Sequence, residues 1–361
     1  MLFHFFTSLI EQYSFLNVFK YLTFRTGLSV ITSLIVVFII GAPLIKVFSE
    51  KMITGPIRQD GPIDHIVKKS GTPTMGGVII IIGIIAGTLL WSDLTNIYVW
   101  VLIFVSLSLG SLGLLDDVLK IKHKNSSGLK SKYKFSGQLI IGAITMFLLI
   151  YYSDHEYLFD LYFPFFKNFI WHMGLFFIPF GVLVIIGASN AVNLTDGLDG
   201  LATVPVMLVA LSFTLISYIV GNTIFSEYLQ IQYIPDVGEL AIFCGSLVGA
   251  CLGFLWYNAP PAKIFMGDTG SLSLGGSLAA VAIIVKHEIV LAIIGGLFVL
   301  ETVSVIIQVI SFKLTGKRIF KMAPIHHHFE KKGWAESTIV IRFWIIAIIL
   351  ALVGLATLKL R

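Results

Sequence analysis

Charged residues are scarce in this sequence. They make up 12% of its 361 positions, whereas hydrophobic residues make up 57%. A soluble globular domain carries about twice that share of charge, so the composition excludes this class. The 33 glycines suit closely packed membrane helices, and the alternating pattern of a membrane barrel is not evident. We therefore expect an all-α polytopic membrane protein with a single domain over residues 1–361.

Signatures of several other classes are also missing. The two cysteines, Cys244 and Cys251, lie in one apolar run, which argues against a disulfide framework or a zinc site. The N-terminal stretch lacks the basic region and cleavage site of a removable signal peptide, so we expect the first helix to be retained. No Walker A, strand-linked GxGxxG or GxSxG sequence occurs. The net charge of +5 fits membrane orientation better than nucleic-acid binding, and no nucleic-acid partner is expected.

Apolar stretches long enough to cross a bilayer, about 17 to 25 residues, occur ten times. We predict transmembrane helices over residues 25–48, 75–92, 97–115, 136–152, 172–189, 201–221, 238–256, 264–285, 290–312 and 338–358. An even number of spans places both termini on one side of the membrane and sorts the loops into two sets.

Basic residues are shared unequally between these two sets of loops. The loops near 49–74, 116–135, 190–200, 257–263 and 313–337 carry seventeen Lys and Arg residues, and the other set, termini included, carries six. Because Lys and Arg concentrate in cytoplasmic loops of membrane proteins, we predict that the first set is cytoplasmic and that both termini are periplasmic.

The unusual polar sequences all fall at or beside the predicted cytoplasmic edges. They are GTPTMGG at 71–77, LLDDVLK at 114–120, SNAVNLTDGLDG at 189–200, WYNAPPAKIFMGDTGS at 256–271 and MAPIHHHFEKKGW at 322–334. The outward loops contain nothing comparable. Any active site is therefore expected in the cytoplasmic loops, several of which must contribute to it.

Three carboxylates mark the ends of two predicted helices. Asp116 and Asp117 end the third span, where the negative end of the helix dipole disfavours them. This pair is either a stop signal solvated with Lys120, or a cation site or proton-accepting pair. Asp268 adds weight to the second interpretation, because it has few charged neighbours and is flanked by glycines that let a ligand approach closely.

The stretch AVNLTDGLDGLA at 191–202 places two acids between apolar runs. Asp196 and Asp199 either cap a turn that leads into the sixth span or face a polar site. Their spacing does not fit an EF-hand loop, which needs ligands at alternating positions and a distal Glu. Asn190 and Asn193 add neutral donors and acceptors, which suit a sugar or the edge of a base.

Basic and aromatic residues of the same loops also have two interpretations each. His326, His327 and His328 point about 100° apart on a helix and so do not readily bind one metal ion. They suit phosphate hydrogen bonds or proton transfer, or form a solvated loop. The lysines between 120 and 134 either hold anionic groups or only set topology, and Phe265 is either core or a stacking surface. Carboxylates, lysines and histidines at one membrane face are the groups needed to hold Mg²⁺ against a polyphosphate whose acceptor lies in the bilayer.

Five motifs, in this order across nearly the whole chain, resemble those of one bacterial family. GTPTMGG, LLDDVLK, SNAVNLTDGLDG, FMGDTGSL and APIHHHFEKKGW are together similar to the phospho-N-acetylmuramoyl-pentapeptide transferases, which belong to the polyprenyl-phosphate N-acetylhexosamine-1-phosphate transferases. The resemblance implies a Mg²⁺-dependent transfer of phospho-MurNAc-pentapeptide from UDP-MurNAc-pentapeptide to undecaprenyl phosphate. Lipid I and UMP would form at the cytoplasmic face of the bacterial inner membrane. The sequence leaves open whether the protein forms a homodimer.

The resemblance also implies roles for individual residues. Asp116 and Asp117 become candidates for activating the lipid phosphate as nucleophile or base, Asp268 and Asp117 become the expected Mg²⁺ ligands, and His326 is a further catalytic candidate. The residues expected to contact the substrates are Lys69, Thr74, Lys120, Lys132, Lys134, Asn190, Asp196, Asn258, Phe265, Gly267, Gln308, His327 and His328.

Two other functions compete with this interpretation. A sister transferase would move GlcNAc-1-phosphate from UDP-GlcNAc to the same lipid, although APIHHHFEKKGW resembles the muramoyl-pentapeptide branch. An ion-coupled transporter or lipid flippase would also use acids within membrane helices. Its site is expected near the midplane, whereas the acids here cluster at one edge.

Overall fold

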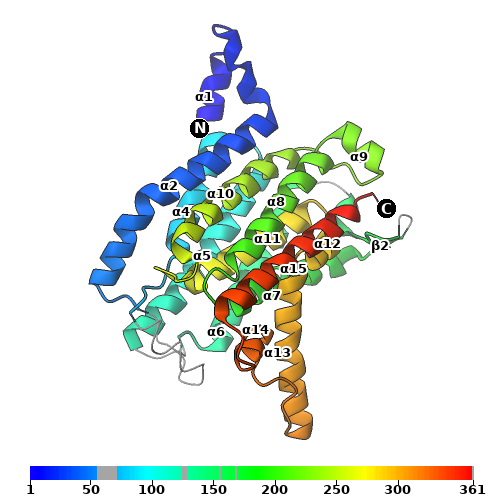
Figure 1. Cartoon of the computed structure of the whole chain (residues 1–361). Helices are drawn as coiled ribbons and strands as arrows, with labels where there is room; N and C mark the ends of the chain where they lie inside the picture. The colour runs from blue at the N-terminus through cyan, green and yellow to red at the C-terminus, as the bar shows by residue number, and fades with distance from the viewer. Residues whose placement is uncertain (55–70, 124–127, 154–155, 167–168, 360–361) are drawn as a thin grey trace.

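The protein is a bundle of long helices (Figure 1). The computed structural model describes residues 1–54, 71–123, 128–153, 156–166 and 169–359. In these residues nine helices are long and apolar enough to span a membrane, and α4 (Gly77–Trp91) is a shorter apolar helix. The nine are α2 (Leu22–Glu50), α5 (Ile97–His123), α6 (Ser131–Tyr152), α7 (Phe177–Thr195), α8 (Thr203–Val220), α10 (Leu240–Asn258), α11 (Gly267–Ile284), α13 (Gly296–Thr315) and α15 (Glu336–Ala356). The predicted all-α polytopic fold is confirmed, with an apolar helix at each of the ten predicted spans.

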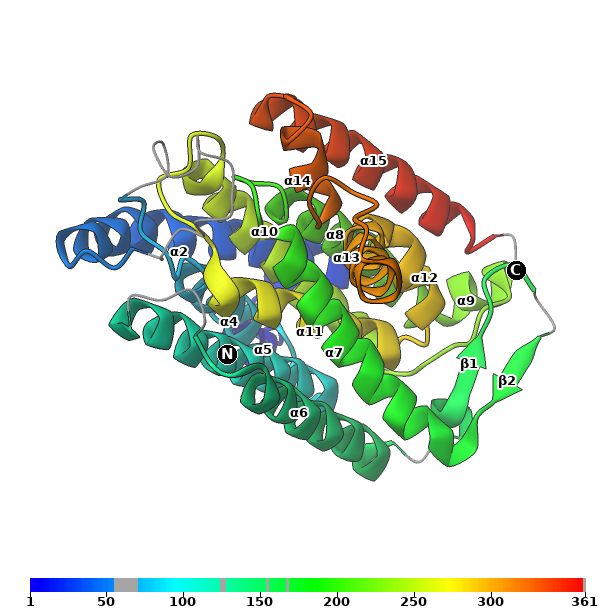
Figure 2. The ribbon, with the colours of Figure 1, turned by 90° about the horizontal axis from the view of Figure 1, so that it is seen from below.

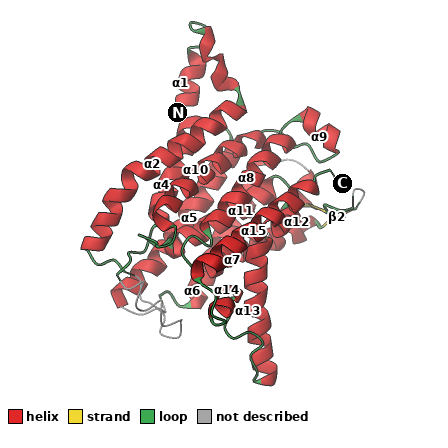
Figure 3. Cartoon of the chain, viewed as in Figure 1, coloured by secondary structure: helices red, strands yellow, loops and turns green. Residues whose placement is uncertain are grey.

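Short elements connect these helices, and Figure 3 shows how little of the chain is strand. The helical ones are α1 (Leu2–Ser8), η1 (Ser14–Lys20), η2 (Glu156–Phe159), η3 (Gly174–Phe176), α9 (Thr223–Leu229), η4 (Val237–Glu239), α12 (Glu288–Ile294) and α14 (Ile325–Glu330). Strands β1 (Asp160–Tyr162) and β2 (Ile170–His172) pair antiparallel, with Leu161 opposite Trp171.

Helices α10 and α11 form the centre of the bundle. The first packs against α2, α4 and α8, and the second against α5 and α7. Small residues permit this packing: a Cβ at Gly77 of α4 would overlap the backbone of Gly270 in α11, and one at Gly113 of α5 would overlap the backbone of Asp268. Close backbone approach at small residues is the usual way in which membrane helices associate. It brings the end of α5 directly against the start of α11.

The termini and the polar loops lie at opposite ends of the bundle. In Figure 1 both termini lie at one end, while the connections after α2, α5, α7 and α10 and the segment around α14 lie at the other. Figure 2 shows α6 and α15 on opposite sides of the bundle. The placement of the termini and loops agrees with an even number of crossings and with the gathering of the polar motifs at one edge. The orientation of the bundle in a membrane remains a prediction.

Two helices depart from their predicted spans. Helix α5 continues two turns beyond residue 115, so Asp116 and Asp117 lie inside a helix and not at its end. The predicted span 290–312 is divided into α12 and α13 at Gly295, where two consecutive glycines weaken the helix. The far part of α13 extends from the bundle (Figure 1) and exposes apolar side chains such as Phe312 and Leu314.

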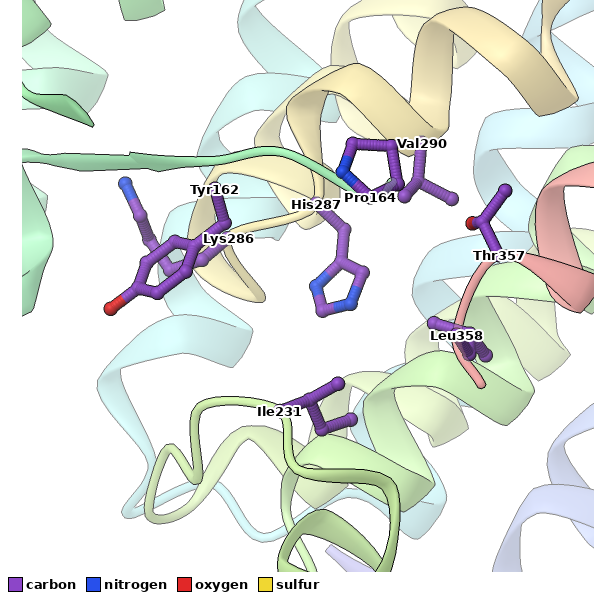
Figure 4. A pocket seen from close by; sticks show the side chains of 8 residues that line it. All are labelled: Tyr162, Pro164, Ile231, Lys286, His287, Val290, Thr357 and Leu358. Atoms are coloured by element: carbon purple, nitrogen blue, oxygen red, sulfur yellow. The ribbon is translucent and has the colours of Figure 1, made fainter. Parts of the chain in front are cut away.

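A buried lysine lies at the end of the bundle that bears the termini. Lys286, between α11 and α12, is 1% exposed; its Nζ donates to the Leu158 carbonyl at 2.9 Å and lies 3.3 Å from Glu288 Oε1. Figure 4 shows it beside a cavity of about 10 Å³ lined also by His287 and Tyr162. Burial lowers the pKa of Lys286, and the charge of Glu288 opposes that shift. The hydrogen bond from Lys286 to Leu158 holds η2, which precedes β1, against the helical core.

Candidate active site

Two carboxylates and two ammonium groups meet at the end of the bundle opposite the termini. Lys120 Nζ lies 2.7 Å from Asp116 Oδ2 and 3.0 Å from Asp268 Oδ2. Lys134 Nζ lies 2.5 Å from the same oxygen of Asp268 and 3.5 Å from that of Asp116. We call these four residues the charge cluster. It joins the consecutive helices α5 and α6 to the distant start of α11, so the structure brings Asp116, Lys120, Lys134 and Asp268 together in one place.

Local structure around Asp116 places both lysines. Lys120 follows Asp116 by four residues in α5, which puts the two side chains on one face of the helix. The Leu129 N–H donates to Asp116 Oδ1 at 2.5 Å, and this bond holds the chain that enters α6 against α5. Gly128 before it has φ +47 and leaves room for the carboxylate. Lys134, in the first turn of α6, is thereby directed at the cluster.

Asp117 supports the start of α11. Its Oδ1 accepts the Asp268 N–H at 3.1 Å, and its Oδ2 accepts the Thr269 N–H at 3.0 Å and the Thr269 hydroxyl at 2.8 Å. The first N–H groups of a helix have no partner within the helix, and an anion there also interacts favourably with the helix dipole. Asp117 thus fixes the backbone of Asp268, and three donors already occupy the carboxylate that was predicted as a metal ligand. Its role as a ligand stays a prediction.

The GTPTMGG motif lies alongside the segment that leads into α11. The Phe265 N–H donates to the Pro73 carbonyl at 2.9 Å, and the Gly76 N–H donates to the Phe265 carbonyl at 2.9 Å. Gly267 has φ +73, and a Cβ there would lie 2.6 Å from Asp117 Oδ2 and 3.1 Å from the hydroxyl oxygen of buried Thr74. Gly267 and Thr74 thus lie next to Asp117, and their contact with the substrate stays a prediction. Residue 267 must be glycine because of its positive φ and because a Cβ would meet the Asp117 carboxylate.

The end of α7 provides an amide, Asn193, which the sequence marked as a polar donor but which was not among the residues predicted to contact the substrates. Asn193 Nδ2 donates to Asp268 Oδ1 at 2.9 Å and to Ser271 Oγ at 2.8 Å. Asn190 donates to Gln138 Oε1 at 2.9 Å, and Asp196 ends the helix as its C-cap. Residues three apart share one helix face, so this spacing was the signal that could have added Asn193.

Three described residues that were predicted to contact the substrates, Asn258, Gln308 and Lys132, make no hydrogen bond or ion pair with the charge cluster in the structure. Asn258 is buried; its Oδ1 accepts from the Gly200 N–H and the Thr203 hydroxyl, and its Nδ2 donates to the Ile264 carbonyl. Gln308 binds the backbone of Ile319 and Phe320 in the loop after α13. Both residues hold loops together. Lys132 is exposed and lies about 200° from Lys134 around α6.

The three consecutive histidines have three different surroundings, as their helical spacing predicts. His326 is fully buried, with Nδ1 3.1 Å from Glu301 Oε1. His327 Nδ1 lies 2.5 Å from Glu330 Oε2, and His328 Nδ1 accepts the Lys321 N–H. Partial burial, together with the charges of nearby lysines, lowers the pKa of His328. Predicted site residue Lys69 lies outside the described residues.

The charge cluster has the donors that a magnesium ion needs. Mg²⁺ in phosphoryl-transfer sites is commonly held by one or two carboxylates together with substrate phosphates. Asp116 and Asp268 each direct an oxygen at the same two ammonium groups, so two carboxylates converge. In the part of the chain that the structure describes, no group of three His, Cys, Asp or Glu side chains could hold a metal ion. Two carboxylates are the number that a protein commonly provides to such an ion, so Asp116 and Asp268 could hold Mg²⁺ together with phosphate and water oxygens.

Comparison with known proteins assigns the chain to a family. A model of glycosyl transferase family 4 matches residues 99–286, which contain the whole charge cluster, and signature 1 of the phospho-N-acetylmuramoyl-pentapeptide transferases matches residues 69–81. The chain is 67% identical over 361 residues to the phospho-N-acetylmuramoyl-pentapeptide-transferase of Pelagibacter ubique (strain HTCC1062). It is 53% identical over 367 aligned residues to the protein of the same name from Maricaulis maris (strain MCS10), and both matches cover each chain completely. The chain therefore belongs to the phospho-N-acetylmuramoyl-pentapeptide transferase family.

Proposed function

We propose that this chain transfers phospho-MurNAc-pentapeptide from UDP-MurNAc-pentapeptide to undecaprenyl phosphate and so forms lipid I and UMP. The observation that carries the proposal is the charge cluster at one end of a membrane bundle, in a chain of this family. A soluble nucleotide sugar and a lipid phosphate can meet only where water and bilayer adjoin. The excess of Lys and Arg in the loops of this end supports a site that faces the cytoplasm, in the inner membrane of a bacterium.

In the proposed reaction an oxygen of undecaprenyl phosphate attacks the β-phosphorus of the nucleotide. The bond from that phosphorus to the bridging oxygen breaks, and the oxygen leaves with UMP. The protein's share of such a transfer is mainly positioning and neutralisation of charge. Lys120 and Lys134 would exchange their carboxylate partners for phosphate oxygens, because an ammonium group binds either anion.

Asp116 and Asp268 would hold Mg²⁺, which when bound neutralises the diphosphate and stabilises the leaving phosphate. Asp117 would keep the α11 N-terminus, and with it Asp268, in place. Asn193 would fix the second oxygen of Asp268 and so orient the carboxylate. Thr74, Phe265 and Asp196 lie on segments around the same end and would contact the nucleotide sugar.

The test supplies purified protein in detergent with undecaprenyl phosphate, Mg²⁺ and one of two nucleotide sugars. UDP-MurNAc-pentapeptide should give UMP and a lipid-linked product in equal amounts, and chelation of Mg²⁺ should stop both. Preference for UDP-GlcNAc would identify the sister transferase. Vectorial uptake into proteoliposomes without UMP release would instead identify a transporter.

A further inference from the structure

Two fully buried ionisable side chains meet beside the end of α7. Glu301 in α13 and His326 in the first turn of α14 are both 0% exposed, and Glu301 Oε1 lies 3.1 Å from His326 Nδ1. Apart from this 3.1 Å approach to each other, none of the four side-chain oxygen and nitrogen atoms of the pair has a polar partner among the described residues. Buried polar groups are rarely left in this state, and an acid inside an apolar helix generally marks a functional site. Each side chain is therefore the natural partner of the other.

The opposite side of the imidazole faces the turn after α7. A Cβ at Gly197 would overlap His326 Nε2 and lie 2.9 Å from Cε1, so only glycine lets the ring approach this closely. Gly197 directly follows Asp196, and Asn193, which binds Asp268, lies one helical turn earlier. A continuous path of contacts thus leads from Glu301 through His326 to the α7 end of the active site.

We infer that Glu301 is a positioning residue that acts through His326. The carboxylate accepts the Nδ1 proton of the imidazole, which fixes the tautomer and the ring orientation and directs Nε2 at the Asp196–Gly197 turn. Carboxylates that orient a functional histidine in this way are common in active sites and metal sites. The inference rests on the proposed function, because the turn it holds belongs to the site proposed to bind the nucleotide sugar.

Other ionisable side chains lie on α14 and on the segments next to it, and they must stay unchanged in the test. His327 and Glu330 lie on α14 itself, Asp196 and Asp199 lie on the turn after α7, and Glu336 begins α15 and accepts the Asp199 N–H. None of these five side chains is altered in the test. The changes are confined to Glu301 and His326.

A double-mutant cycle with Glu301→Gln and His326→Ala tests the inference. The readouts are kcat and KM for UDP-MurNAc-pentapeptide, from UMP release in detergent, and the thermal midpoint of each variant. Glu301→Gln keeps the shape of the side chain but removes its charge and one of its two acceptors. It should lower kcat about 10- to 100-fold, the usual cost of losing a partner that orients a histidine, with KM changed less than about threefold. In the His326→Ala background the same change should have no further effect on kcat.

Glu288→Gln is the matched control, because it makes the same chemical change in a buried acid at the other end of the bundle. It should lower the thermal midpoint and leave kcat unchanged. The inference is overturned if Glu301→Gln leaves kcat within about threefold of wild type, or lowers it equally in both backgrounds. It is also overturned if kcat simply follows the thermal midpoint across all variants. A wild-type protein that releases no UMP would instead overturn the proposed function.

Discussion

Replacement of Asp117 by Asn separates support of α11 from metal binding. The Asp117 carboxylate accepts three hydrogen bonds, at 3.1, 3.0 and 2.8 Å, from the first residues of α11. Asn has one acceptor oxygen in place of two, and its NH₂ group would face one of the donors of Asp268 or Thr269. Loss of one charge-assisted bond costs about 1.5 to 3 kcal/mol, and loss of the anion at the helix N-terminus costs about 0.3 to 1 kcal/mol more. The free energy of unfolding should therefore fall by about 2 to 4 kcal/mol.

An unfolding entropy of about 2 cal/mol/K per residue converts this loss into a thermal midpoint lower by about 3 to 5 °C. A thiol-reactive fluorophore in detergent can report the midpoint, because Cys244 and Cys251 in α10 are both completely buried until the bundle opens. Asp268→Asn is the comparison, since it alters the same site but leaves the Asp117 hydrogen bonds in place. The helix-support role would be refuted if the thermal midpoint of Asp117→Asn equals that of wild type. It would also be refuted if that midpoint is not below the midpoint of Asp268→Asn.

Three further predictions follow from other contacts described above. Asp268→Asn should lower UMP release by at least about 100-fold with normal folding, because an amide is a poor Mg²⁺ ligand; near-normal turnover at saturating Mg²⁺ would contradict this. Gly113→Ala should slow the reaction by at least about tenfold, since its Cβ would displace the Asp268 backbone, whereas Gly27→Ala, with open space around it, should not. Burial lowers the pKa of Lys286 below its ordinary 10.5, so the unfolded chain binds more protons. Wild-type stability should therefore rise as the pH approaches 10.5 from below, and Lys286→Met should lose this part of the slope.

The sequence predicts the spans and the location of the site because both depend on local patterns. Each long apolar run is helical, although the run 290–312 is divided between α12 and α13, and the motifs at the run ends lie at one end of the bundle. The pairing of Asp116 with Lys120 could also be predicted from the sequence, because residues four apart share a helix face. Periodicity therefore determined which side chains could face one another along a helix and at which end of the bundle they lie.

Contacts between distant segments could not be predicted from local sequence patterns. Asp117 accepts hydrogen bonds from residues 151 and 152 positions later, and no local pattern encodes that distance. The apolar run 290–312 hides the break at Gly295, because hydropathy does not register a change of helix direction. Glu301 was overlooked although a single acid inside a long apolar run is itself a signal of function.

The transfer of one phosphate tests the account most directly. UDP-MurNAc-pentapeptide radiolabelled at the β-phosphate would be incubated with the protein, Mg²⁺ and undecaprenyl phosphate, and the label in the organic phase compared with the UMP released. The account predicts that label and UMP appear in equal amounts and that Asp268→Asn abolishes both. Label that stays in the aqueous phase, or full transfer by the Asp268→Asn protein, would contradict it.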